Sequence, residues 1–498
     1  MIKLVKNELI KILKKRNIYF LFLLAIIIII IYNCINPDQN IITSSNNSTN
    51  NIPIKGMETN LDNLKENTEE YITQKATIEF YKLYNSFEKD SWQRYALNEE
   101  RNKRNIDNVY TDYNIDIMNY LYNITDYQFN SETKTNIDKY EYSKTKFDEY
   151  VKALNLNDWK KFVNLKIENL EEEKNKEELL EAEIEEIELE IEIYKIRLYN
   201  NINFGNNVSN QYIEQYKNNY YNIKSYQVNT YSESQDFINK SIDECKAQME
   251  LYKYALENNI EYDISNEKNL INNNKIDARI AFIRVFKHFN LIIVVIAIYI
   301  SSTIITEEIN KKTIKNLLTK PHKRRTILIA KMIACMVIII ITMIFIAFVQ
   351  YIVGGIIFGF DSYTYNYIGY NYNTSQVFIL NLFKYIVIVG FTKIFMYLII
   401  IIFCILIGIM NKNIAMSMVL TLIVFLIFDT VMAEWSKVET FSVITRFFIT
   451  NNWDFSVFLF GNTSNISGIT LFTSIITYLI YFIIMFKISL TKFKKLEI

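Results

Sequence analysis

The charged side chains within the apolar runs of this chain are the residues that are best placed to take part in chemistry. Lys331, Lys384, Lys393 and Asp429 lie within or beside long aliphatic stretches, where a charge is costly and can mark the path of a substrate or proton. Lys331 is one turn from a basic segment and can extend its side chain to the interface, while Lys384 and Asp429 lie near the ends of their stretches. Lys393 is the deepest, so it is a candidate pathway residue; a position at the outer boundary is an equal alternative.

The sequence lacks the residue patterns that phosphate binding or metal binding would require. None of the ten glycines is followed by lysine, so the phosphate-binding pattern G-x-x-x-x-G-K is absent. Two histidines, His288 and His322, are too few for a histidine metal site, and the four cysteines form no C-x-x-C pair. We therefore expect no catalytic residue, no metal or other cofactor, no ATPase site and no nucleic-acid partner.

A basic segment between two apolar runs holds the most specific pattern. Residues 291–306 carry no charge, and residues 327–350 would form a helix of about 36 Å, enough to cross a bilayer. Between them, the turn 307–325 places Ile314, Leu317 and Leu318 at helical spacing among lysines. Pro321 ends this helix because it lacks an amide hydrogen and restrains the preceding residue. A short helix with one apolar side at a membrane surface suits the docking of a partner protein.

Six apolar stretches are long enough to span a lipid bilayer. They predict an all-α membrane protein with six transmembrane helices and a large helical domain between the first two. The first stretch is a retained anchor rather than a cleaved signal peptide, because no small-residue cleavage site follows it. The expected spans are 17–35, 289–306, 327–350, 388–410, 414–431 and 469–486.

Charge is strongly segregated although the net charge is zero. Lys and Arg exceed Asp and Glu by five in residues 1–16, by six in 307–331 and by three in 487–498, whereas 17–306 has 31 basic and 45 acidic residues, a net of −14. Short basic flanks mark the cytoplasmic side, and long domains are translocated whatever their charge. We therefore expect a multi-pass protein of the cell membrane with both termini inside and residues 36–286 outside.

The N-terminal residues 1–16 predict an amphipathic helix at the membrane interface. Its apolar face would hold Ile2, Val5, Leu9, Ile12 and Leu13, with lysines opposite. Residues 287–498 would form the remaining membrane domain. In that domain, residues 433–468 contain aromatic clusters that favour an interfacial or re-entrant segment.

The outer region 36–286 carries two apolar stripes with the same 4-3-4-3-4 spacing. Such spacing is typical of narrow helical seams, and the turn around Gly205 lies between them. We expect an antiparallel coiled-coil hairpin at about 158–257, in which the stripes serve core packing rather than a ligand groove. The stripes are Leu180, Ile184, Ile187, Ile191, Tyr194 and Leu198, and Ile238, Ile242, Cys245, Met249, Tyr252 and Leu256.

The turn and its flanks resemble the ABC-2-type permeases, the membrane subunits of bacterial ABC exporters. The matching stretch is E-x-x-x-x-T-x-K-x-L-L-x-x-P-x-x-R-x-x-I, and Lys312 departs from it because the family usually has glycine there. The large domain after span one is similar to that of low-GC Gram-positive members. The matched positions are Glu308, Thr313, Lys315, Leu317, Leu318, Pro321, Arg324 and Ile327.

The resemblance implies a division of labour between chains. A separate ABC ATPase subunit would dock on the turn, and a second permease copy or a homologous permease would complete the transporter. It also implies export. The acidity of region 17–306 suits a cationic amphipathic substrate such as an antimicrobial peptide, and an equal alternative is that this acidity only keeps the long outer helices soluble. The alternative is a membrane-anchored sensory or adhesion protein, which would need only one or two spans. Four further spans and a docking turn favour transport. The implied coupling residues are Glu308, Thr313, Ile314, Lys315, Leu317, Leu318, Pro321 and Arg324.

Overall fold

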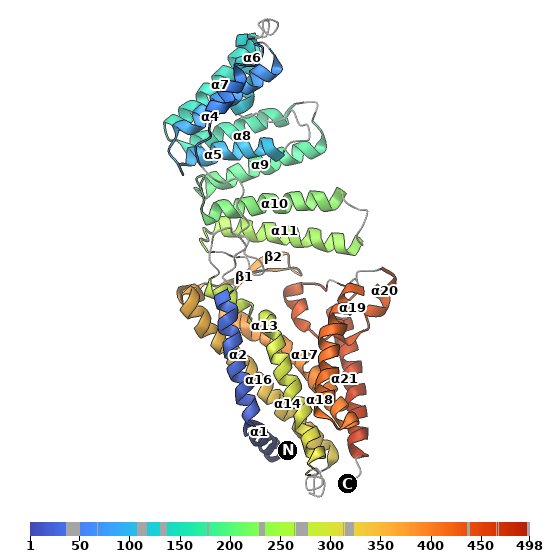
Figure 1. Ribbon diagram of the computed structural model, residues 1–498. Helices are drawn as coiled ribbons and strands as arrows, with labels where there is room; N and C mark the ends of the chain where they lie inside the picture. The colour runs from blue at the N-terminus through green and yellow to red at the C-terminus, as the bar shows by residue number, and fades with distance from the viewer. Residues whose placement is uncertain are drawn as a thin grey trace. The chain divides into compact units, whose positions relative to one another are not determined.

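The computed structural model is almost entirely helical (Figure 1). It describes residues 1–35, 50–66, 68–106, 117–129, 137–176, 179–228, 235–262, 264, 277–311, 313, 323–435, 439–464, 466 and 468–495. The chain forms two compact units. The bundle unit comprises Met1–Asn40, Tyr220–Leu251 and Ile264–Ile498, and the acidic unit comprises Ile41–Asn219 and Tyr252–Asp263.

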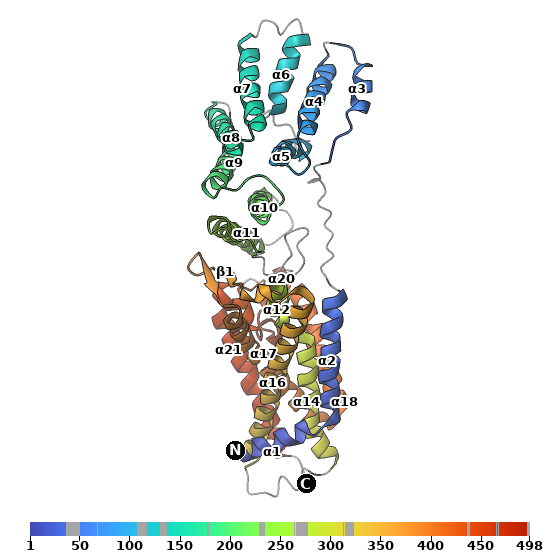
Figure 2. The same cartoon turned by 90° about the vertical axis from the view of Figure 1, so that its left-hand side faces the viewer.

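Among the residues that the structure describes, six helices of the bundle unit are long and apolar enough to cross a membrane, as many as the sequence predicts. They run side by side in both views (Figure 1 and Figure 2). The third has 35 residues, about 52 Å of helix, and so extends beyond the predicted span at its C-terminal end. They are α2 (Arg16–Ile35), α14 (Asn290–Asn310), α16 (Arg324–Phe358), α17 (Leu382–Asn411), the stretch Ile414–Met432 that begins with α18 (Ile414–Ile423), and α21 (Leu471–Lys494).

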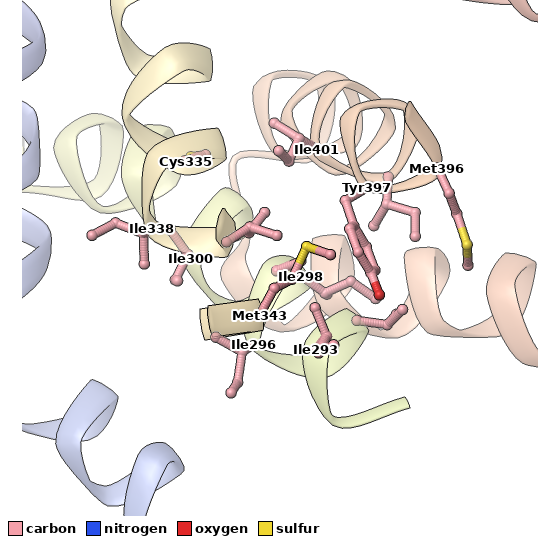
Figure 3. Close-up of a cluster of buried hydrophobic side chains, with 14 of the residues drawn as sticks. Ile293, Ile296, Ile298, Ile300, Cys335, Ile338, Met343, Met396, Tyr397 and Ile401 are labelled. Carbon is pink, nitrogen blue, oxygen red and sulfur yellow. The ribbon is translucent and has the colours of Figure 1, made fainter. Parts of the chain in front are cut away.

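The core of the bundle unit lies where α14 meets α16 and α17. Ile293 and Ile298 of α14 lie near Tyr397 of α17, and Ile300 lies near Ile338 of α16; all of them belong to one buried cluster (Figure 3). In a bilayer such contacts stabilise the bundle by van der Waals packing, because lipid tails are as apolar as isoleucine. This packing positions the polar groups described below.

Helix α1 (Ile2–Leu13) lies across one end of this bundle (Figure 2) and packs on α16. Its buried side chains are Leu4, Glu8 and Ile12, one helical turn apart, whereas Ile2 and Leu13 stay exposed. The face of α1 that contacts protein therefore has a carboxylate at its centre and differs from the apolar face that the sequence predicts. Ile2 and Leu13 are left for contact with the surroundings.

The link between α16 and α17 contains the two strands of the described residues, and the sequence did not predict them. After a 3-10 turn, η2 (Asp361–Thr364), strands β1 (Tyr367–Asn371) and β2 (Gln376–Leu380) pair antiparallel with Tyr367 opposite Leu380. Segment 433–468 forms only short elements: the end of α19 (Asp429–Trp435), then α20 (Glu439–Thr445), η4 (Ile449–Asn451) and η5 (Phe455–Gly461).

The acidic unit is a set of helices around an aromatic core. Trp92, Tyr150, Phe162 and Phe204 pack together there, and Lys166 pairs with Glu100 beneath them. The unit holds 23 Lys and Arg against 37 Asp and Glu, a net of −14. Its complete helices are α3 (Lys55–Leu61), α4 (Glu69–Ser86), α5 (Trp92–Ile106), α6 (Ile117–Phe129), α7 (Ile137–Asn155), α8 (Trp159–Lys174) and α9 (Glu181–Tyr199).

Within its described residues, region 158–257 contains four helices, α8 to α11, whereas the sequence predicts two long arms. All of the first stripe except Leu180 lies on α9; Leu180 precedes this helix and is 69% exposed. The turn with Gly205 follows α9 and leads into α10 (Val208–Val228). The second stripe lies on α11 (Gln235–Glu257). The two spacings mark the apolar faces of real helices, with Ile191 and Tyr252 buried on them. Spacing alone does not reveal how many helices separate two faces.

Candidate coupling site

A lysine buried among apolar helices is the centre of the candidate site. Lys331, in the second turn of α16, has no exposed surface. Its Nζ donates to Glu8 Oε2 at 2.8 Å and to the Ile304 carbonyl oxygen at 3.1 Å, and it lies 2.9 Å from Glu308 Oε2. The expectation that Lys331 extends to the interface is therefore wrong. Its ammonium group points into the protein because acceptors from α1 and α14 surround it.

Lys11 of α1 completes a closed arrangement of four charges. Its Nζ lies 2.8 Å from Glu8 Oε1 and 2.8 Å from Glu308 Oε1. Each carboxylate therefore places one oxygen on Lys11 and the other on Lys331. We call Glu8, Lys11, Glu308 and Lys331 the charge ring. Its net charge is zero, which offsets the large desolvation cost of holding two carboxylates in the protein.

Residues of the charge ring shift the pKa values of Glu8 and Lys11. Burial alone would raise the pKa of the Glu8 carboxyl, but Lys331 and Lys11 outweigh it and lower this pKa below its ordinary value. Burial alone would lower the pKa of Lys11, but hydrogen bonds to Glu308 and Glu8 raise it. Both groups are therefore charged at neutral pH. Outside the ring, Lys15 lies 2.8 Å from Glu307 and ties the start of α2 to the end of α14.

The structure describes both ends of the predicted coupling turn. At the first, Glu308 belongs to the charge ring, and Thr313 Oγ1 donates to the Glu308 carbonyl oxygen at 3.4 Å. At the second, Arg324 opens α16 and donates to the carbonyl oxygen of Lys494 near the end of α21. The turn is thus anchored to α1 on one side and to α21 on the other. Ile314, Lys315, Leu317, Leu318 and Pro321 lie outside the described residues.

Glu8 and Lys11 were not predicted as site residues from the sequence. A signal was present: Glu8 is the one acidic residue among six basic ones in residues 1–16. Such an isolated carboxylate on an otherwise basic helix indicates a specific cationic partner. The partner, Lys331, could not be predicted from the sequence, because it is 323 residues away in the chain.

A pair of buried amides fastens the far ends of the same helices. Asn33 Nδ2 donates to Gln350 Oε1 at 2.8 Å, and Gln350 Nε2 donates back to Asn33 Oδ1 at 3.1 Å. A side chain at Gly354, one turn along α16, would place its Cβ 2.9 Å from the hydroxyl of Tyr363 and 3.4 Å from Gln350 Nε2. The glycine therefore leaves room for these polar groups. With Glu8–Lys331 at one end and Asn33–Gln350 at the other, α1, α2 and α16 form one block.

Lys393, the candidate pathway residue, has a counter-ion. Its Nζ pairs with Asp454 Oδ2, while Asp454 Oδ1 accepts from the amide of Ser456 at 3.0 Å and caps η5. Lys393 is 12% exposed in its side chain. The pair links α17 to the segment between the fifth and sixth apolar helices. A place for Lys393 in a substrate pathway stays a prediction.

Comparison with known proteins adds one result. A profile of the family described as ABC-2 family transporter protein matches residues 2–497, nearly the whole chain. Comparisons with curated proteins and with solved structures found no match.

Proposed function

The chain belongs to the ABC-2 family of transporter proteins, and on this premise we propose that it drives substrate movement through the turn 307–325. As a family member it is the membrane component of an ABC transporter and works with an ABC ATPase subunit. The ATPase docks on the apolar side of the turn, at Ile314, Leu317 and Leu318. A second permease, identical or homologous, completes the transporter.

The charge ring is the observation that carries this proposal. It joins Glu308, at the first end of the turn, to α1 and α16 through Lys11 and Lys331. Because Glu8 holds α1 on the same lysines, a displacement of the turn moves α1, α2 and α16 together. The turn thus transmits force into helices rather than into a loop.

We further propose the sidedness of the chain. The three basic segments, 1–16, 307–331 and 487–498, all belong to the bundle unit, which supports a cytoplasmic place for both termini and for the turn. The acidic unit is then extracellular, and its net charge of −14 attracts cations. This favours a cationic amphipathic peptide, such as an antimicrobial peptide, as the molecule that is exported or kept out.

The test is docking of the partner ABC ATPase subunit. Replacing Leu317 and Leu318 with Asp puts two charges against an apolar groove, at a cost of several kcal/mol. We expect the variant to reach the membrane but to lose the ATPase on co-purification with nucleotide trapped. The matched control is Ile379→Asp, an exposed apolar residue on β2. Full transport-linked ATPase activity in the double variant would contradict the proposal.

A further inference from the structure

The acidic unit contains a cleft that the coupling function does not use. Its volume is about 490 Å³, within the range of about 300–1,000 Å³ that is common for ligand sites. It lies between the α8–α9 pair and the end of α11, and all of its lining residues belong to the acidic unit.

The bottom of the cleft is apolar and its rim is aromatic on one side. Ile191 and Ile196, on α9, are both over 90% buried and line the cleft. Tyr199, at the end of the same helix, is 86% exposed. An aromatic ring in this position offers a face for an apolar group or for a cation.

The charged residues that line the cleft form lysine–glutamate pairs, except for one glutamate, Glu257. Three lysines of the cleft each pair with a cleft glutamate: Lys174 with Glu188 at 2.5 Å, Lys195 with Glu171 at 3.3 Å and Lys253 with Glu192 at 2.8 Å. All six side chains are at least 35% exposed, so each pair contributes little energy and exchanges readily. Glu257, also in the lining, has no basic partner among the described residues.

We propose that this cleft binds a cationic amphipathic peptide segment, an inference that rests on the proposed function and names the site within it. A lysine or arginine of the peptide pairs with Glu257 beside the ring of Tyr199, and a neighbouring apolar side chain covers Ile191 and Ile196. Further cations of the peptide replace the cleft lysines on Glu171, Glu188 and Glu192. A cation is favoured over an anion, because the lining holds one more carboxylate outside the pairs but no lysine outside them, and the unit carries −14.

The experiment measures binding without the ATPase. The full-length protein is placed in phosphatidylcholine nanodiscs, which give the probe no anionic lipid, and is titrated with a fluorescent twelve-residue Lys/Leu peptide. We expect Glu257→Gln and Tyr199→Ala each to weaken Kd about threefold. Lys253→Met should strengthen binding about twofold, because it frees Glu192 for the peptide. Opposite effects within one cleft cannot come from misfolding.

The matched control is Asp243→Asn, an exposed carboxylate on the same helix outside the cleft. It should leave Kd unchanged at 150 mM salt, where screening acts over about 8 Å. An equal loss in Asp243→Asn and Glu257→Gln would overturn the proposal, because it would reduce binding to general surface charge. The Leu317/Leu318 double variant should bind the peptide normally, so failure of the coupling proposal and failure of the cleft give different results.

Discussion

Lys331 shows under which conditions a membrane bundle tolerates a fully buried ammonium group. A lysine without a partner among apolar helices would lose one proton and become neutral, or it would destabilise the helices around it. Here two carboxylates and one carbonyl oxygen surround it. The second lysine, Lys11, then neutralises the extra negative charge. The residues are interdependent, because removing any one leaves the ring with a net charge.

The first prediction follows from this neutrality. Lys331→Met leaves Glu8 and Glu308 with Lys11 alone, and an uncompensated buried charge costs about 3–5 kcal/mol. We expect a large fall in the unfolding midpoint in detergent. Adding Glu8→Gln to Lys331→Met restores a neutral pair, so the double variant should be more stable than the single one. Lys384→Met, at an exposed lysine of α17, is the control. A double variant less stable than Lys331→Met would refute the ring.

The second prediction concerns pH. The pKa of Glu8 is lowered from 4.5 in the folded protein, so its contribution to stability is present above pH 4.5 and is lost as pH falls through the lowered value. The pKa of Lys11 is raised from 10.5, so its contribution is present below pH 10.5 and is lost at higher pH. A spin label at Ile10→Cys, with the native cysteines replaced, should report constant mobility at neutral pH and higher mobility in acid. In Glu8→Gln the acid transition should disappear, and its persistence would assign it to another group.

The third prediction separates two roles of Lys393. Because the Lys393–Asp454 attraction is symmetric, the charge swap Lys393→Asp with Asp454→Lys should recover the thermal stability that either single change loses. If Lys393 also lines the pathway, transport should stay low in the swapped protein, since the cation is then on η5. Recovery of stability and transport together would make the pair structural only.

At this scale the sequence identifies charges but not their partners. Hydropathy alone placed Lys331 and Lys393 inside apolar stretches. It could not show that Lys331 faces Glu8 or that Lys393 faces Asp454, since each pair is brought together only by helix packing. Lys331 was assigned to the interface because an unpaired lysine has no other low-energy choice.

Among the helical elements, asparagine takes the place of glycine at several ends. Asn157, Asn201 and Asn259 adopt left-handed φ angles of 57°, 54° and 50°. The amide of the residue after each donates back to a carbonyl within the helix, at 3.0, 2.8 and 2.9 Å, which is the Schellman arrangement. Asparagine tolerates this conformation better than other side chains. With ten glycines in 498 residues, the chain ends its helices largely without glycine.

The fourth prediction tests these ends. Asn201→Gly removes the strain of a left-handed side chain and should raise the unfolding free energy by up to about 1 kcal/mol. The same change at Asn200, where φ is −91°, should lower it, because glycine there only adds freedom to the unfolded chain. Denaturant unfolding followed by tryptophan fluorescence compares the two. Equal effects at both positions would show that φ does not decide them.

Elements with strong periodicity were predictable and those without it were not. The six spans follow from uninterrupted apolar length, and the stripes around Ile191 and Tyr252 mark genuine buried faces. The strands β1 and β2 were not predicted, because apolar and polar residues do not alternate clearly around Gly369 and the adjacent tyrosines. The hairpin at 158–257 was predicted with two arms because Gly205 is the single glycine of this range, which contains no proline.

In the whole molecule, the negative net charge and the basic segments belong to different units of the fold. The entire deficit of −14 in 17–306 lies in the acidic unit, and the rest of that region is balanced. The bundle unit carries the basic segments and the charge ring. The bundle unit therefore holds the candidate coupling site, and the acidic unit holds the cleft and the net negative charge that would attract a cation.

The fifth prediction is that the two units can be separated functionally. The hydroxyl of Tyr32, near the end of α2, lies 2.9 Å from Nδ1 of His288, the last residue of α13 (Val285–His288). A short Gly/Ser linker can therefore replace residues 36–276 and join α2 to α12 (Ala278–Ile283), which precedes α13. This deletion removes the acidic unit together with the segment Tyr220–Leu251 of the bundle unit, and leaves every membrane helix in place. We expect this protein to co-purify with its ATPase, because the charge ring and turn are untouched. Cells that carry it should lose protection against a cationic peptide. Unaltered protection would reduce the acidic unit to a scaffold, and loss of ATPase binding would show that the turn depends on it.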